Sequence, residues 1–176
     1  MGYFLSPFGL TPMPMPRSSD AAVSLSVFDR LTDSEPYNSQ EVAPTRVQSL
    51  RQLRESVRRD LEWLLNTRRV AVPPDEELQK VNRSLYIFGL PDFTAYSLAS
   101  PKDQAKLLRH LQTTLKVFEP RLASVRITPL ETPGVGSRKL RFRIEGLLRV
   151  DPAPEHVSFD TMLELGSGQY EVRDAG

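Results

Sequence analysis

The hydrophobic pattern of this chain changes its period at Pro120, and this change strongly limits the folds that the chain can adopt. Before Pro120, apolar residues recur at steps of three and four, which is the spacing of one face of a helix. After Pro120 they alternate with polar residues, which is the spacing of a half-buried strand. The order predicts an α+β domain in which two main helices pack on a small antiparallel β-meander.

A long first helix is predicted from Thr45 to about Asn66. Thr45 and Gln48 have the spacing of a capping box, which satisfies two backbone amides at a helix start. Asn66 tolerates the left-handed conformation found at many helix ends. The apolar face of this helix consists of Leu50, Leu53, Val57, Leu61 and Leu64. Seven arginines against three acids between residues 46 and 69 predict a basic outer face.

A second main helix is predicted between Ser100 and Glu119. Ser100 can cap it, and Pro101 stands at the favoured first position. Pro120 disfavours a helical Glu119, so the helix should end there. Its apolar stripe consists of Leu108, Leu111, Leu115 and Phe118. Short helical segments are expected at Ser24–Leu31, Glu76–Val81 and Ser84–Phe88.

The strands follow one another to the end of the sequence. Alternation predicts them around residues 125–127, 140–150, 157–165 and 170–172, with a turn at Gly166–Gly168. Prolines and serines predict a disordered tail over residues 1–22 and a linker over residues 32–44. We therefore expect one domain, residues 23–176, behind a proline-rich N-terminal tail.

The composition excludes several kinds of site. The chain has no cysteine and only two histidines, His110 and His156, neither of which has a metal-binding spacing with another ligand. We expect no metal and no cofactor. The net charge is +1, so no global attraction to nucleic acid follows. No apolar run approaches the roughly 18 residues that span a bilayer, so no direct membrane insertion is expected.

No pattern of residues indicates catalysis. Glu119, Asp92 and Glu145 could supply the paired carboxylates of a glycosidase, but nothing in the sequence fixes their separation. Neither histidine lies in a nucleophile motif. The loop Gly134–Lys139 lacks the spacing of a phosphate loop and precedes a strand. The sequence therefore favours a protein that is not an enzyme, with a peptidoglycan hydrolase as the alternative.

Several arginines could line the wet face of the sheet. They are Arg121, Arg126, Arg138, Arg141, Arg143 and Arg149. Binding of single-stranded nucleic acid would require exposed aromatic side chains between them, but Phe142 has the phase of the core. A solvated or protein-facing surface is favoured, and a nucleic-acid or regulatory binding module is a further alternative.

Glu119, Pro120 and Arg121 lie where the second helix meets the first strand. In an extended segment, residues two apart point the same way, so Glu119 and Arg121 can present opposite charges side by side. Spacing alone favours an internal junction, in which these charges pair with each other.

The trio is one of several stretches that resemble a known family. The others are Phe28–Leu31, Leu61–Arg68, Ser84–Phe93 and Leu140–Val150. Their order and spacing resemble the type VI secretion baseplate protein TssE, a family related to the baseplate-wedge protein of contractile-tailed phages and once described as lysozyme-like. The chain departs from the family at Phe88, where a tyrosine is expected before the glycine.

The resemblance implies a non-catalytic structural subunit of a contractile injection machine. Such a subunit binds the other wedge subunits and the sheath proteins, and it starts sheath assembly. It lies in the cytoplasm, at a baseplate docked on the inner face of the cytoplasmic membrane complex. By resemblance, Glu119, Pro120 and Arg121 contact neighbouring subunits. We expect Arg141 and Arg143 to contribute to partner binding.

The end of the meander suggests how sheath proteins could attach. A last strand at Gln169–Arg173, or its neighbour, would leave an edge with unpaired backbone groups. Such an edge can accept a strand from another chain. We therefore expect the sheet edge to template the first sheath ring by strand addition.

Overall fold

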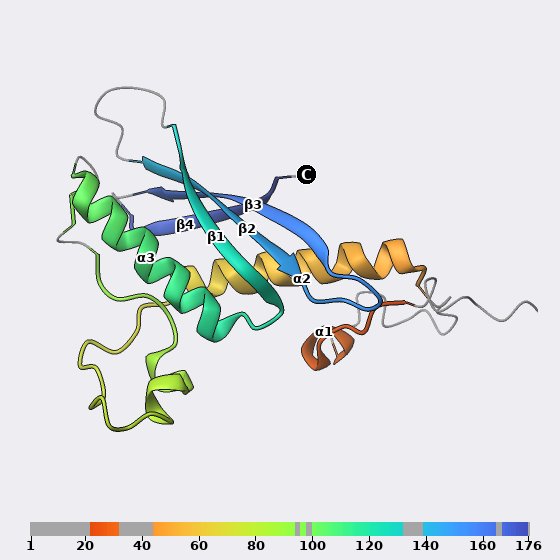
Figure 1. Cartoon of the computed structure of the whole chain (residues 1–176), viewed down its shortest axis with the longest axis horizontal. Helices are drawn as coiled ribbons and strands as arrows, with labels where there is room; N and C mark the ends of the chain where they lie inside the picture. The colour runs from red at the N-terminus through yellow and green to blue at the C-terminus, as the bar shows by residue number, and fades with distance from the viewer. Residues whose placement is uncertain are drawn as a thin grey trace, which may run out of the picture.

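The computed structural model describes residues 22–31, 44–93, 96–97, 100–131, 139–164 and 167–175. Along the chain these form α1 (Val27–Leu31), α2 (Arg46–Asn66), η2 (Val81–Arg83), η3 (Leu85–Ile87), α3 (Pro101–Phe118), β1 (Leu122–Leu130), β2 (Lys139–Leu148), β3 (Glu155–Glu164) and β4 (Gln169–Asp174) (Figure 1). Most of the expected tail and linker, and residues 134–138 of the glycine-containing loop, lie outside the described residues. The α+β architecture is confirmed.

The four strands form one antiparallel meander in the order β1-β2-β3-β4, as the alternating pattern predicts. Phe142 and Phe159 lie on the buried face, whereas Arg143 and Asp160 face each other on the opposite face. A bulge in β1 contains Ser124, whose φ is 52°. The extra residue keeps Leu122 and Val125 on the buried face although they are three positions apart.

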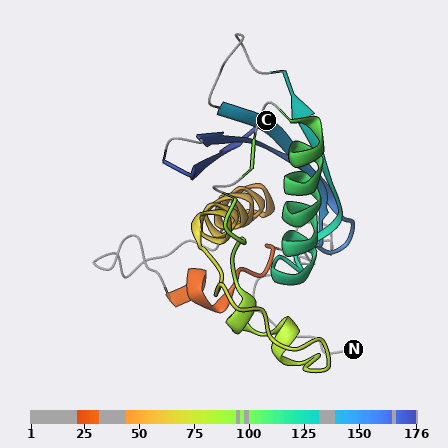
Figure 2. The ribbon, with the colours of Figure 1, turned by 90° about the vertical axis from the view of Figure 1, so that its left-hand side faces the viewer.

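Both long helices cover the same face of the sheet. Figure 2 looks along α2 and shows α2 and α3 on one side of the strands. α2 packs against β4, and α3 packs against β1. The core between these two layers includes Leu53, Val57, Leu61, Leu107, Leu111, Leu115, Phe142, Ile144, Val157 and Phe159. The other face of the sheet has no described element packed on it.

The ends of α2 agree only partly with the prediction. Both hydrogen bonds of the Thr45–Gln48 capping box are present. The helix ends at Asn66 as expected, but Asn66 is not left-handed, because Ser124 is the one non-glycine residue with positive φ in the described ranges. On α3 the buried stripe contains Leu107, while the predicted Leu108 is half-buried.

The segment between α2 and α3 is joined to the domain by a short bridge. Arg68 and Leu90 form a parallel β-bridge. Gly89 has φ +97°, and a Cβ there would lie 2.3 Å from the carbonyl oxygen of Thr67, so glycine is required for this approach. The helical segment expected at Glu76–Val81 is wrong, because the first helical turn after α2 is η2, which begins only at Val81. η3 lies within the predicted Ser84–Phe88 turn and is capped by Ser84.

Candidate protein-interaction site

Glu119 and Arg121 form an ion pair at the junction between α3 and β1. The Nε of Arg121 donates to Oε1 of Glu119 at 2.6 Å, and its Nη2 donates to Oε2. Glu119 is 3% exposed, whereas the Arg121 side chain is 26% exposed. This is the bidentate geometry in which guanidinium and carboxylate groups bind most strongly.

Helix α2 supplies the remaining partners of Arg121. Its Nη2 donates to Oδ2 of Asp60 at 2.6 Å, and its Nη1 donates to the hydroxyl of Ser56 at 3.3 Å. Ser56 and Asp60 lie one helical turn apart and therefore face the same side. The ion pair consequently holds the α3–β1 junction against α2.

The same network holds α1 against α2. Oδ1 of Asp29 accepts from Nη2 of Arg59 at 2.8 Å, and Oδ2 accepts from the hydroxyl of Ser56 at 2.6 Å. The hydroxyl of Ser26 also donates to Asp29. Arg59 in turn contacts Asp60 at 3.2 Å. A single chain of charges therefore connects α1, α2 and the junction at Glu119.

These contacts keep the groups ionised. Burial opposes the charge on Asp29, but hydrogen bonds from Ser26, Ser56 and Arg59 outweigh it and lower its pKa from 3.8 to about 2. Burial also disfavours the Arg121 cation, yet its hydrogen bonds to carboxylates raise the pKa of Arg121 above its ordinary value. Both groups are therefore charged near pH 7.

A groove of about 450 Å³ opens beside this network. We call it the junction groove, and it is lined by Ser26, Phe28, Asp60, Trp63, Leu64, Phe88, Phe118, Glu119, Pro120 and Arg121. Phe88 and Phe118 pack edge to face with their ring centroids 5.2 Å apart. The Arg59 guanidinium lies 5.3 Å from the centroid of the Phe28 ring.

Large apolar side chains remain accessible at the junction groove. Trp63 is 64% exposed, Phe28 is 57% exposed, and Pro120 is also exposed. Aromatic and proline surface next to a partly exposed arginine is typical of protein interfaces, where Trp and Arg are enriched. The arrangement can bind a protein surface that offers apolar side chains and a carboxylate or carbonyl group.

The structure brings together three of the five residues predicted to bind partners. Glu119, Pro120 and Arg121 lie at the junction groove, but the Glu119 charge is paired inside the chain. Arg141 and Arg143 lie on the open face of the sheet, on the side opposite to the helices. Arg143 donates to Asp160 at 2.7 Å.

The sequence interpretation missed three residues of this site. Asp60, Ser56 and Trp63 all lie on α2 and contribute to the network or to the junction groove. Trp63 carried a usable signal, because a tryptophan outside the apolar stripe of an amphipathic helix is exposed. Asp60 and Ser56 carried no such signal in the sequence, because their partner Arg121 is more than 60 residues away.

The edge of β4 is partly covered at Gln169–Arg173, where the sequence predicts strand addition. The Asn66 side-chain amide donates to the carbonyl oxygen of Tyr170 at 2.9 Å and accepts from its N–H at 2.9 Å. Arg58 Nη1 donates to the carbonyl oxygen of Val172 at 3.1 Å. Side chains of α2 therefore occupy three of the backbone groups that an added strand would need, and strand addition at this edge stays a prediction.

The opposite edge of the sheet is also interrupted. The carbonyl oxygen of Val125 accepts from Nε2 of Gln112 at 2.8 Å, so it points away from β2. Backbone groups alternate in direction along a strand. The backbone groups of Pro129, four residues after Val125, therefore also point away from β2. Because proline has no N–H, β1 offers an incomplete row of donors to another strand.

The described ranges give no support to metal chemistry or to a membrane span. No group of three or more His, Asp or Glu side chains there could hold a metal ion. Among the described helices, none is both long enough and apolar enough to cross a bilayer.

Comparison with known proteins gives one family. The profile of a family described as baseplate wedge protein gp25 matches residues 51–153, which is more than half of the chain. The search of curated proteins found no match. Among solved structures, one chain from "The baseplate complex from the type VI secretion system" is similar, with 22% identity, a TM-score of 0.44, and coverage of 72% of this chain and 96% of that chain.

Proposed function

The chain belongs to the family of baseplate wedge protein gp25, and on this basis we propose that it is a structural, non-catalytic subunit of a type VI secretion baseplate. The family match over residues 51–153 is the observation that carries the proposal. The choice of a type VI machine rests on the sequence stretches that resemble TssE. The subunit would act in the cytoplasm, at a baseplate docked on the inner face of the membrane complex.

The wedge subunits would bind at the junction groove. Trp63 and Phe28 offer apolar surface there, and Pro120 and Arg121 form part of the same wall. Glu119 would act through Arg121, because its own carboxylate is buried and hydrogen-bonded. A buried ion pair of this kind fixes the position of a contact residue even when it contributes little net stability.

Sheath proteins would contact the open face of the sheet. The Arg141 side chain makes no hydrogen bond or ion pair within the described ranges, and Arg141 lies between Lys139 and Arg143 along the outer side of β2. Side chains on this face can pair with acidic groups of another protein. We propose this face for sheath attachment in preference to the edge of β4, because side chains of α2 cover backbone groups at that edge.

Co-expression with the wedge subunits tests the proposal. The wild-type chain should co-purify with them, and Trp63→Ser should reduce the recovered complex at least tenfold. Val47→Ser is the matched control, because Val47 is equally exposed on α2 but does not line the junction groove. A Glu119→Ala/Arg121→Ala double variant should also lose binding if it remains folded. Equal recovery of wild type and Trp63→Ser would contradict binding at this groove.

A hydrolase assay tests the non-catalytic part of the proposal. Purified protein incubated with cell-wall sacculi should release no soluble glycan fragments above a boiled control. Release that disappears in Glu119→Ala, with the fold intact by circular dichroism, would identify an enzyme instead.

A further inference from the structure

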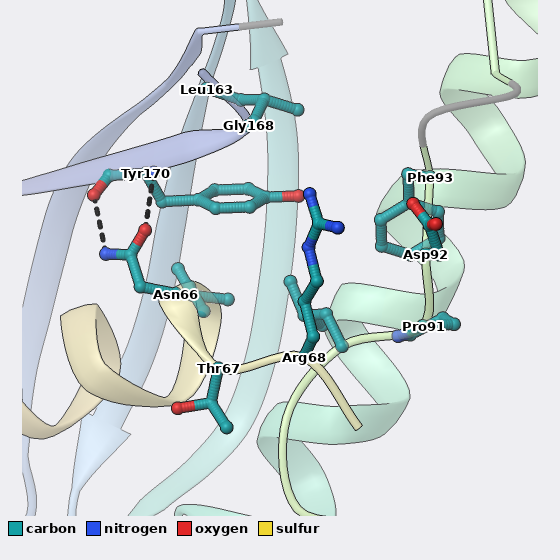
Figure 3. Close-up of a pocket in the computed structure, with 11 residues that line it drawn as sticks. Asn66, Thr67, Arg68, Pro91, Asp92, Phe93, Leu163, Gly168 and Tyr170 are labelled. Carbon is teal, nitrogen blue, oxygen red and sulfur yellow. Dashed lines mark hydrogen bonds between the residues drawn. The ribbon is translucent and has the colours of Figure 1, made fainter. Parts of the chain in front are cut away.

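A second, smaller pocket lies at the C-terminal end of α2. It has a volume of about 70 Å³ and is separate from the junction groove, because the two share no lining residue. Its walls come from the end of α2 and the following residues, from residues 90–93, and from β3 and β4. Figure 3 shows Arg68, Asp92, Phe93 and Tyr170 around it. We call it the Tyr170 pocket.

The Tyr170 hydroxyl is a buried group with an unmet hydrogen-bonding requirement. Tyr170 is 6% exposed, and its hydroxyl has no hydrogen-bond partner within the described residues. Burial raises the pKa of Tyr170 above its ordinary value, so the hydroxyl is protonated and can donate. Leaving such a donor without a partner is costly, which makes a bound acceptor favourable.

Arg68 lines the same pocket as Tyr170. In Figure 3 the Tyr170 ring crosses the pocket and its hydroxyl points toward the Arg68 guanidinium. That guanidinium forms no hydrogen bond or ion pair with another described residue. Gly168 borders it, since a Cβ at Gly168 would be in ordinary van der Waals contact with Nη2 of Arg68, at 3.5 Å. Two kinds of donor therefore face the same small space.

Several cations lie near His110, next to the Tyr170 pocket. Phe93 forms one wall and packs against His110, with ring centroids 5.8 Å apart. Burial, and then repulsion from Arg69, Arg109 and Lys106, lower the pKa of His110. The same cations favour a bound anion near this end of α2.

We propose that the Tyr170 pocket binds a carboxylate group, with the Arg68 guanidinium and the Tyr170 hydroxyl as its two donors. A guanidinium matches the two oxygens of a planar carboxylate, and the hydroxyl can donate to one of them. The volume admits a carboxyl group and little else. Asp92 lies at the same pocket and opposes a doubly charged phosphate more strongly than a singly charged carboxylate.

The carboxylate could belong to an acidic side chain of a protein or to a small free acid. The site does not depend on the baseplate assignment, because the pocket is complete in one chain and can be tested with this protein alone. If the pocket binds no carboxylate, the proposed baseplate function is unaffected. If the baseplate proposal fails, the carboxylate site is equally unaffected.

Titration of the full chain with sodium acetate at constant ionic strength tests the shared chemistry. NMR should show saturable shifts of the Arg68 side-chain Nε–H and of the Tyr170 ring, with a dissociation constant on the order of 10 mM. Tyr170→Phe should weaken binding about tenfold, because one hydrogen bond to a charged group is lost. Its melting temperature should not fall, since the hydroxyl has no partner to lose.

Controls separate the site from general anion binding and identify the source of the carboxylate. Arg68→Gln should abolish the shifts, while Arg83→Gln, which changes an exposed arginine of η2, should leave them unchanged. Tighter binding of acetyl-Gly-Glu-Gly-amide than of acetate would assign a protein side chain, and equal or weaker binding would assign a free acid. Acetyl-Gly-Gln-Gly-amide, which lacks the carboxylate, should cause no shifts. Shifts that do not saturate, that persist in both pocket variants, or that this glutamine peptide reproduces would overturn the proposal.

Discussion

The carboxylate of Glu119 accepts two hydrogen bonds from the Arg121 guanidinium and one from the Arg121 backbone N–H, in a position that water barely reaches. At the scale of single residues, this pair makes the Glu-Pro-Arg trio an internal junction whose arginine also borders an accessible groove. The two interpretations of the trio are therefore compatible. Glu119 positions the arginine, and Arg121 together with Pro120 remains available to a partner.

Replacement of Glu119 by alanine should lower the free energy of unfolding by about 3 kcal/mol, because it leaves the half-buried Arg121 with one carboxylate partner fewer. Urea denaturation measures this loss. Glu145→Ala on the open face of the sheet is the control and should cost about 0.5 kcal/mol or less. Equal effects of the two substitutions would show that the ion pair does not stabilise the junction.

Acid should release α1 from α2 before the domain unfolds. The pKa of Asp29 is lowered to about 2 from 3.8, so its contribution is complete above about pH 5 and is lost as the pH falls toward 2. NMR shifts of the Ser26 and Asp29 amides across this range measure the release. In Asp29→Asn the same transition should be absent, and α1 should be detached already at pH 7.

At the scale of elements, α2 both fills the core and closes an edge. Its apolar face contacts the sheet, while Asn66 and Arg58 satisfy backbone groups of β4. Natural sheets protect their edges in such ways because unpaired backbone groups invite other strands. The position of Asn66 at the last turn of α2 therefore serves β4 rather than a left-handed helix end.

Asn66→Ala should expose the Tyr170 backbone N–H and C=O and cost about 1–2 kcal/mol of stability. The opened edge should also increase self-association, which sedimentation velocity at several concentrations would detect. Gln52→Ala, an exposed position on the same helix, is the control for the loss of an amide side chain. A monomeric Asn66→Ala variant of unchanged stability would contradict the role given to this residue.

At the scale of the whole molecule, the two faces of the sheet have different tasks. One face is covered by α2 and α3, which also supply part of the lining of the junction groove. The other face carries arginines and acids and has no described element on it. This division allows a small domain to contact two neighbours at once, as a subunit between a wedge and a sheath would.

Reversing a charge on the open face of the sheet should weaken the proposed contact with the sheath and leave the proposed contact with the wedge subunits intact. Arg141→Glu should change the free energy of unfolding by about 0.5 kcal/mol or less, because Arg141 has no ion pair within the described ranges. Sheath assembly in cells, followed as fluorescent sheath structures, should fall sharply, while co-purification with wedge subunits should persist. Lys116→Glu on α3 is the control and should leave both unchanged. Normal sheath formation with Arg141→Glu would exclude this residue from sheath binding.

The sequence by itself determined what depends on near neighbours along the chain. The Thr45–Gln48 capping box, Ser100 with Pro101, and the alternation of Leu140, Phe142 and Ile144 each act within a few residues. They were enough to predict the two long helices, their ends to within a few residues, and the antiparallel meander. The family resemblance rested on short stretches such as Leu61–Arg68, Ser84–Phe93 and Leu140–Val150, and the family match over residues 51–153 confirms it.

Only the tertiary structure decided which charges and edges are satisfied. Arg121 meets Asp60 across 61 positions, and Asn66 meets Tyr170 across 104. A periodic pattern assigns a residue to a face but does not state which distant side chain lies opposite, because that depends on how the layers pack. The burial of Glu119, the covered backbone groups of β4 and the unpartnered hydroxyl of Tyr170 all follow from this packing.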